Sequence, residues 1–245
     1  MAEITKNEAL VLRKTNFSDS SLIVELYTKE HGKISAIIKG ARSSKSRIGS
    51  KIDTLNLVEA VFYHKEQKEL QLVTQANLIS HFHNIKSDLE RVKYASAIVE
   101  LILKLVPEKD ANEKLFRGVV KSLNLMDKEN SQPILHFTQF FMFFIKEIGF
   151  ELSFTNCSSC GNEINNSDHN AFSYTDGIVC GNCNKDKLTT FDFSTELFEL
   201  FLCLTSKNKK LSYKKSDLEN IIFILEKYII YHNSDFKGLK TLSIF

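Results

Sequence analysis

The hydrophobic pattern of this chain changes its period once, near residue 80, and this change divides the fold. Before it, five short segments are rich in Val, Ile, Leu, Phe and Tyr, and several alternate apolar with polar residues as half-buried strands do. The segments are residues 8–17, 22–28, 33–39, 55–64 and 69–79. Five short strands with a longer connection after the third fit a small closed barrel of the OB type. An SH3-like barrel is the main alternative.

After residue 80 the apolar residues recur with helical spacing. Helices are expected over residues 87–106, 112–126 and 133–149, and again over two stretches after residue 190. Ser87–Glu90 and Ser216–Glu219 have the pattern of capping boxes at helix starts. The third helix is apolar nearly all round, which predicts a place at the centre of a helical core.

These patterns predict an α+β multidomain chain. An OB-type barrel occupies residues 1–80, and an all-α domain is built from residues 81–153 and 191–245. Residues 154–190 are inserted into the helical domain and contain four of the five cysteines. The fifth, Cys203, lies in an apolar helical stretch and is expected to be a buried core thiol.

The inserted cysteines form two CxxC pairs, Cys157–Cys160 and Cys180–Cys183, separated by nineteen residues. A two-residue gap lets one tight turn point both sulfurs at the same ion, and two such turns complete a tetrahedron. Four thiolates leave no position for an activated water, so the spacing predicts one structural Zn²⁺ ion. Asp176-Gly177 between the pairs predicts a tight hairpin, which makes the insertion zinc-ribbon-like.

Other interpretations of these residues are weaker. His169 lies between the pairs and would serve as a ligand only by displacing a cysteine. Two redox motifs would need a strand-helix context, whereas loops surround both pairs. His64 and Glu66 followed by a CxxC resemble part of a zinc deaminase pattern, but Asn156 stands where that pattern has proline before Cys157.

Composition excludes several classes of protein. The formal net charge is only +2, so the whole chain is not a polycation. No apolar run reaches the roughly 18 to 20 residues that a membrane helix needs, and the first residues do not resemble a signal peptide. Paired CxxC motifs in such a chain favour a reducing compartment. We therefore expect a cytoplasmic protein with no membrane partner.

One local stretch is strongly basic. Residues 33–51 contain six cations and no acidic residue, together with serines that can bond phosphate oxygens. Such a stretch suits a polyanion, because lysine and arginine contacts to phosphates dominate nucleic-acid affinity. The six cations are Lys33, Lys39, Arg42, Lys45, Arg47 and Lys51.

Four stretches make the chain similar to a known family. The first three lie in the expected barrel and the fourth near the C-terminus, and they are Glu8–Arg13, Tyr27–Ile34, Lys39–Arg47 and Phe236–Leu242. They resemble the bacterial recombination-mediator family RecO, whose order of barrel, helices, cysteine insertion and helices also matches. The chain departs from the family's Tyr-Gly-Glu-x-Asp at Phe17–Ser21.

The resemblance implies a non-enzymatic role in DNA repair, without a small-molecule substrate. RecO-like proteins bind single- and double-stranded DNA, anneal complementary strands, and act with RecR to load the RecA recombinase onto coated single strands. They also contact the acidic C-terminal tail of the single-strand-binding protein. A cytoplasmic, nucleoid-associated location follows from this role.

Matching the basic positions of the family's motifs places DNA contacts on five residues, namely Arg13, Lys39, Arg42, Lys45 and Arg47. The basic stretch adds Lys33 and Lys51 to the expected set. An RNA-binding or ribosome-associated barrel with a zinc ribbon is the alternative function.

Overall fold

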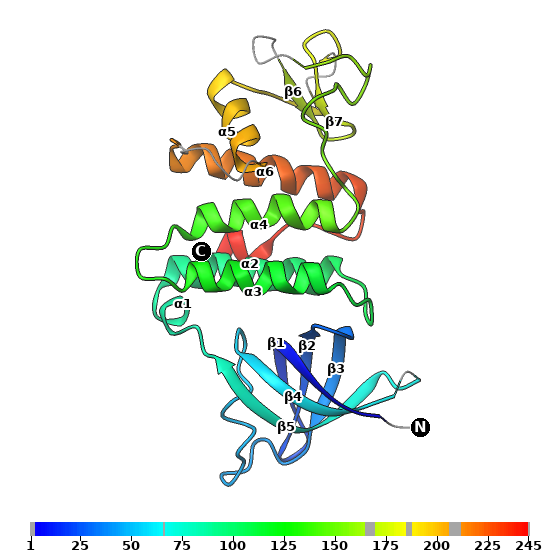
Figure 1. Cartoon of the computed structure of the whole chain (residues 1–245), viewed down its shortest axis with the longest axis vertical. Coiled ribbons are helices and arrows are strands. Elements are labelled where there is room, and N and C mark those ends of the chain that lie inside the picture. The colour runs from blue at the N-terminus through cyan, green and yellow to red at the C-terminus, as the bar shows by residue number, and fades with distance from the viewer. Residues whose placement is uncertain (1–2, 66, 165–169, 185–187, 206–211, 245) are drawn as a thin grey trace. The chain divides into compact units, whose positions relative to one another are not determined.

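The computed structural model describes residues 3–65, 67–164, 170–184, 188–205 and 212–244. The chain forms two compact units, residues 1–133 and 134–244 (Figure 1). The division falls within the span expected to be one helical domain. The expected domain limits at residues 80, 153 and 190 therefore stay predictions, and each unit is described by itself.

The first unit begins with a closed five-stranded barrel. Its strands are β1 Glu3–Phe17, β2 Ser21–Thr28, β3 Gly32–Ile38, β4 Leu57–His64 and β5 Leu70–Ser80. They are ordered β1-β2-β3-β5-β4 around the barrel, and only the β3–β5 pairing is parallel. This arrangement confirms the predicted OB-like barrel. Alternate residues face the interior, as the period-two pattern requires, and they include Val11, Val24, Ala36, Phe62 and Val73.

Three helices complete the first unit. They are α1 His83–Ser87, α2 Leu89–Leu105 and α3 Glu113–Met126. The cap of α2 is Asp88, whose side chain accepts a bond from the Arg91 backbone N–H, so the predicted cap at Ser87 is wrong by one residue. Ser87 is the last residue of α1 and is therefore helical, so the extended residue that caps α2 is Asp88. At α3, the Asn112 side chain caps the helix by accepting a bond from the Leu115 N–H.

The barrel joins these helices through a close backbone approach at the β2–β3 turn. Gly32 has φ +64°, and a Cβ placed on it would lie 2.2 Å from the carbonyl oxygen of Asp110. Next to it, the Lys109 N–H donates to the Lys33 carbonyl at 2.9 Å. Only glycine fits this position, because it tolerates positive φ and has no side chain to meet the facing backbone.

The second unit contains four helices and one small sheet among its described residues. The helices are α4 Pro133–Glu147, α5 Thr195–Thr205, α6 Lys215–His232 and α7 Lys240–Ile244. The sheet has the order β7-β6-β8, with β6 Ala171–Ser173, β7 Gly177–Val179 and β8 Thr190–Asp192. β6 and β7 pair around Asp176-Gly177, which confirms the predicted hairpin.

Three details of the second unit bear on the predictions. The phenylalanines of α4 are almost all buried, as expected for a core helix. Helix α6 begins at Lys215, and the carboxylate of Asp217 accepts the Lys214 N–H, so the capping box predicted at Ser216–Glu219 is wrong. Cys203 is half-buried rather than buried. Among the described helices of both units, none is long and apolar enough to cross a membrane.

Candidate functional site

The connection between β3 and β4 contains most of the basic stretch, and residues 39–51 are called here the cationic segment. It is tethered to the barrel at several points. Ala41 and Ile48 pack against the barrel core, as does Ile52 just after the segment, and the Arg42 backbone N–H donates to the Ser20 carbonyl at 2.8 Å. A Cβ on Gly49 would lie 1.9 Å from the Ala41 carbonyl oxygen, so the segment folds back closely on itself. The cationic side chains are therefore presented by an ordered loop.

Four cations of the segment are exposed, and these are Lys39, Arg42, Lys45 and Arg47. Within the described part of the chain, no ion pair neutralises any of them. Three of the four line a groove of about 600 Å³, together with residues 74–77 of β5. A chain of phosphates in this groove would meet both cations and amide or hydroxyl groups.

The other three expected DNA contacts already have partners. The Lys33 ammonium donates to the Leu103 carbonyl at 2.9 Å, and burial lowers the pKa of Lys33. Lys51 donates to the Ala76 carbonyl at 2.8 Å and so ties the end of the segment to β5. Arg13 is exposed but forms an ion pair with Glu25 across β1 and β2. Lys33 and Lys51 are thus partly buried and bonded within the fold, and Arg13 is ion-paired, which distinguishes these three residues from the four exposed cations.

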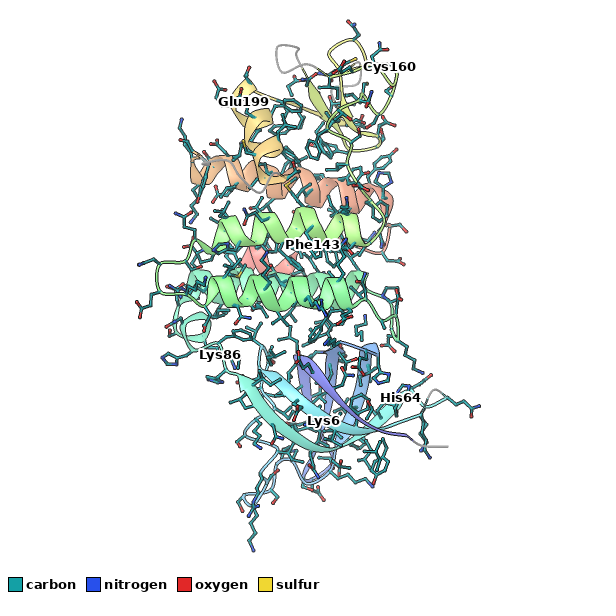
Figure 2. The ribbon with its side chains drawn as sticks, in the orientation of Figure 1. Lys6, His64, Lys86, Phe143, Cys160 and Glu199 are labelled. Atoms are coloured by element: carbon teal, nitrogen blue, oxygen red, sulfur yellow. The ribbon has the colours of Figure 1, made fainter. Side chains whose placement is uncertain are left out.

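A polar cluster holds the chain just beyond the cationic segment. Asp53 accepts from Lys14 at 2.6 Å and lies 3.3 Å from the ammonium of Lys86, which is labelled on α1 in Figure 2. Lys86 also donates to the Asn56 side chain. Burial alone would raise the pKa of Asp53, but the hydrogen bond from Lys14 and the charges of Lys86 and Lys14 outweigh it and lower the pKa below its usual value.

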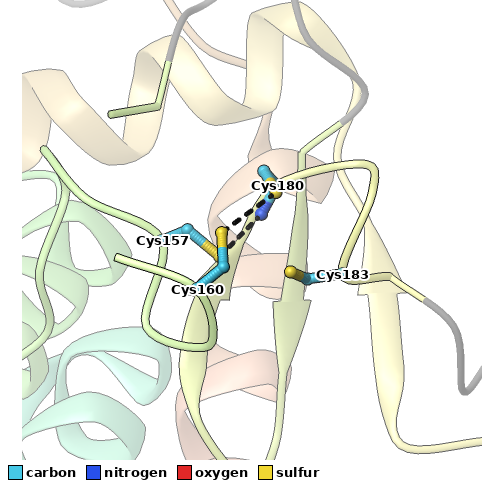
Figure 3. A group of neighbouring side chains, drawn as sticks. All are labelled: Cys157, Cys160, Cys180 and Cys183. Atoms are coloured by element: carbon cyan, nitrogen blue, oxygen red, sulfur yellow. Dashed lines mark hydrogen bonds between the residues drawn. The ribbon is translucent and has the colours of Figure 1, made fainter. Parts of the chain in front are cut away.

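The second candidate site is the cysteine cluster of the insertion. The sulfurs of Cys157, Cys160, Cys180 and Cys183 all lie within 4.8 Å of one another, and the four side chains point toward one another (Figure 3). An ion bound by four thiolates at about 2.3 Å implies sulfur–sulfur distances of roughly 3.8 Å in a tetrahedron. The Cys160 and Cys180 sulfurs are 3.8 Å apart. The donor set therefore fits one tetrahedral thiolate-binding ion.

Local turns produce this geometry. The Gly161 N–H bonds the Cys157 carbonyl at 2.9 Å, and the Cys183 N–H bonds the Cys180 carbonyl at 2.9 Å, so each CxxC closes a tight turn. Backbone N–H groups also face the sulfurs, and Cys180 N–H lies 3.3 Å from Cys157 Sγ. Burial would raise the pKa of Cys157, but the N–H groups of Cys180, Cys160 and Ser159 lower it to about 6. Such donors stabilise the thiolate that a metal requires.

Two residues weighed in the sequence cannot be compared with this geometry. His169, the alternative ligand, and Glu66, the acid of the deaminase pattern, both lie outside the described residues.

A third feature, which the sequence patterns did not predict, is a groove of about 420 Å³ along α3 in the first unit. Phe116, Val120 and Leu125 give it an apolar lining, and basic side chains surround that lining. Glu8 is its one acidic lining residue. The sequence did contain a signal for this surface, because Arg117 and Lys121 are spaced to lie on the same face of α3. The four basic lining residues are Lys29, Arg117, Lys121 and Lys128.

Comparison with known families covers nearly the whole chain. The family model described as Recombination protein O N terminal matches residues 1–82, which contain the barrel. The model described as Recombination protein O C terminal matches residues 86–240, which contain the helices and the cysteine cluster.

Individual relatives agree with the family models. The DNA repair protein RecO of Clostridium novyi (strain NT) is 28% identical over 244 residues, which cover 99% of this chain and 93% of that protein. The protein of the same name from Alkaliphilus metalliredigens (strain QYMF) is 27% identical over 233 residues, 94% of each chain. Another, from Caldanaerobacter subterraneus subsp. tengcongensis, is 31% identical over 180 residues, covering 74% of this chain and 71% of the relative.

Proposed function

The chain belongs to the RecO family of DNA repair proteins, and from this premise we propose that it is a non-enzymatic recombination mediator. In this role it binds single- and double-stranded DNA, anneals complementary strands and, with a RecR-like protein, loads recombinase onto coated single strands. It acts in the cytoplasm at the nucleoid. Its proposed ligands are macromolecules, with no small-molecule substrate.

The observation that carries this proposal is the set of four exposed cations that have no ion-pair partner in the described chain. They lie on an ordered loop of an OB-like barrel, the type of fold that binds oligonucleotides through its loops and open face. Exposed cations whose charge no carboxylate neutralises are free to replace the counterions of a phosphate backbone. We assign the DNA phosphate contacts to Lys39, Arg42, Lys45 and Arg47. Lys33 ties β3 to α2, Lys51 ties the end of the cationic segment to β5, and Arg13 pairs with Glu25.

Charge reversal tests the assignment. Arg42→Glu, Lys45→Glu and Arg47→Glu together should weaken binding to single strands and slow strand annealing. The matched control reverses three exposed lysines of the second unit, Lys214, Lys227 and Lys237, and so makes the same change in net charge. Equal effects from both triples would refute a role specific to the cationic segment.

Competition with RNA tests the alternative function in the same assay. A strong preference of the wild-type protein for RNA over DNA of matched sequence would favour an RNA-binding protein and contradict the repair role.

For a protein partner, we propose that the groove along α3 binds the acidic C-terminal tail of the single-strand-binding protein. The groove combines an apolar floor with several cations, and the cations suit the carboxylates of an acidic peptide. Lys121→Glu should weaken binding of a synthetic tail peptide in a fluorescence titration, because Lys121 lines the groove, whereas Arg117 and Lys29 already pair with Glu113. Unchanged peptide affinity would place the tail elsewhere.

For the cysteine cluster, we propose one structural Zn²⁺ ion held by Cys157, Cys160, Cys180 and Cys183. When bound, the ion would cross-link the two turns and, with four thiolate ligands, activate no water. Elemental analysis of the purified protein tests this assignment, and one zinc per chain is the expected result.

A further inference from the structure

The proposed phosphate contacts account for the backbone of a bound strand but not for its bases. Side chains on the outer face of the barrel are available to contact the bases. Sequence-independent binding of single strands usually combines a basic track for the backbone with aromatic side chains on which bases stack. Exposed aromatic residues near the cationic segment are therefore the natural candidates.

Phe17 lies beside the cationic segment. It is the last residue of β1, pairs with Ser21 across the β1–β2 turn, and is 47% exposed. Ser18, the next residue, has φ +54°, and its carbonyl accepts a bond from the Arg42 guanidinium at 3.0 Å. Two bonds from Arg42, to the carbonyls of Ser18 and Ser20, thus link the turn that presents the Phe17 ring to a proposed phosphate contact.

The outer surface of the barrel next to Phe17 carries apolar side chains, although outward-facing positions of a strand are usually polar. Leu22 and Val24 belong to the core cluster, so Ile23 between them faces outward. Strand register aligns Ile23 with Ile37 of β3, and Ile37 with Leu72 of β5. All three are half-buried.

We infer that Phe17 is a base-stacking residue, and that the apolar row of Ile23 and Ile37 continues its platform over the neighbouring strands β2 and β3. The occupant is a single strand of nucleic acid. Its phosphates meet the neighbouring cations, and its unstacked bases meet the apolar row. This inference rests on the proposed function and adds a preference for single strands, because the bases of a duplex already stack on one another.

Because Phe17 carries no charge, replacing it tests the contribution of base stacking to DNA affinity separately from that of the phosphate contacts. Loss of one base–aromatic stack should lower single-strand affinity by about 5- to 150-fold. The salt dependence should stay the same because no cation is removed, and duplex affinity should be unaffected. Phe17→Tyr should keep the affinity, and Phe17→Leu should lose much of it. Phe223→Ala is the matched control, since Phe223 on α6 is also exposed and has the Lys227 ammonium 5.4 Å from its ring centroid.

The measurement is fluorescence anisotropy of labelled single-strand and duplex oligonucleotides with each full-length variant. Photocrosslinking of an iodouracil-substituted strand should label the peptide that contains Phe17. If Phe17→Ala binds single strands like the wild type, or loses single-strand and duplex affinity equally, the inference is overturned while the DNA-binding role stands. If the wild type itself shows no salt-dependent DNA binding, the proposed function fails first.

Discussion

The salt dependence of DNA binding should reveal how many cations of the basic stretch meet phosphates. For a single strand, log K falls with log salt concentration by about 0.7 for each phosphate that the protein neutralises. If all six cations of the stretch made such contacts, the slope would be about −4. The structure leaves four exposed and without ion pairs, which predicts a slope of about −2.8.

Single substitutions test the same count. Lys45→Gln removes an exposed cation and should reduce the slope by about 0.7. Lys33→Gln removes an equal charge, but the ammonium of Lys33 is bonded to the Leu103 carbonyl, so the slope should not change. Lys33→Gln is instead expected to lower the melting temperature slightly, because a partly buried bond is weakened.

The assay is anisotropy of a labelled homopolymer strand across a series of KCl concentrations, with melting curves as a check that each variant is folded. The reasoning would be refuted if Lys33→Gln and Lys45→Gln reduced the slope equally. That result would mean that Lys33 leaves its internal partner when DNA binds.

Three further outcomes follow from the fold. Gly32→Ala should cost at least about 2 kcal/mol of unfolding free energy in a denaturant titration, because positive φ and the Asp110 carbonyl both oppose a side chain. A wild-type-like midpoint would contradict the close approach. Cys160→Ser, or a strong chelator, should lower bound zinc and melting temperature without changing the salt slope; loss of DNA binding in a fully folded variant would place the cluster on the DNA. The lowered pKa of Asp53 adds stability above its unfolded pKa of about 3.9 that is lost as pH falls through the lower folded value. Asp53→Asn should therefore flatten the acid side of the stability curve, and an unchanged curve would show that the bond to Lys14 is absent in solution.

The barrel and the cysteine cluster were predictable because local patterns determine them. Alternation marks each strand, and the CxxC spacing alone brings paired sulfurs into one turn. In contrast, the separation of Lys33 and Lys51 from the exposed cations was not predictable. Their partners, Leu103 and Ala76, are backbone carbonyls, which carry no signal in the side-chain sequence. The groove along α3 was missed for a related reason, since its lining combines a barrel strand and turn with one helix.

The close approach at Gly32 also limits where the chain can be cut into fragments, or joined to a segment of a related protein. The two matching family models meet between residues 82 and 86, but the β2–β3 turn is fitted to the backbone at Asp110. A fragment that ends where the first model ends would leave that turn without its facing chain. The barrel and its first helices should therefore be inherited, transplanted or expressed together.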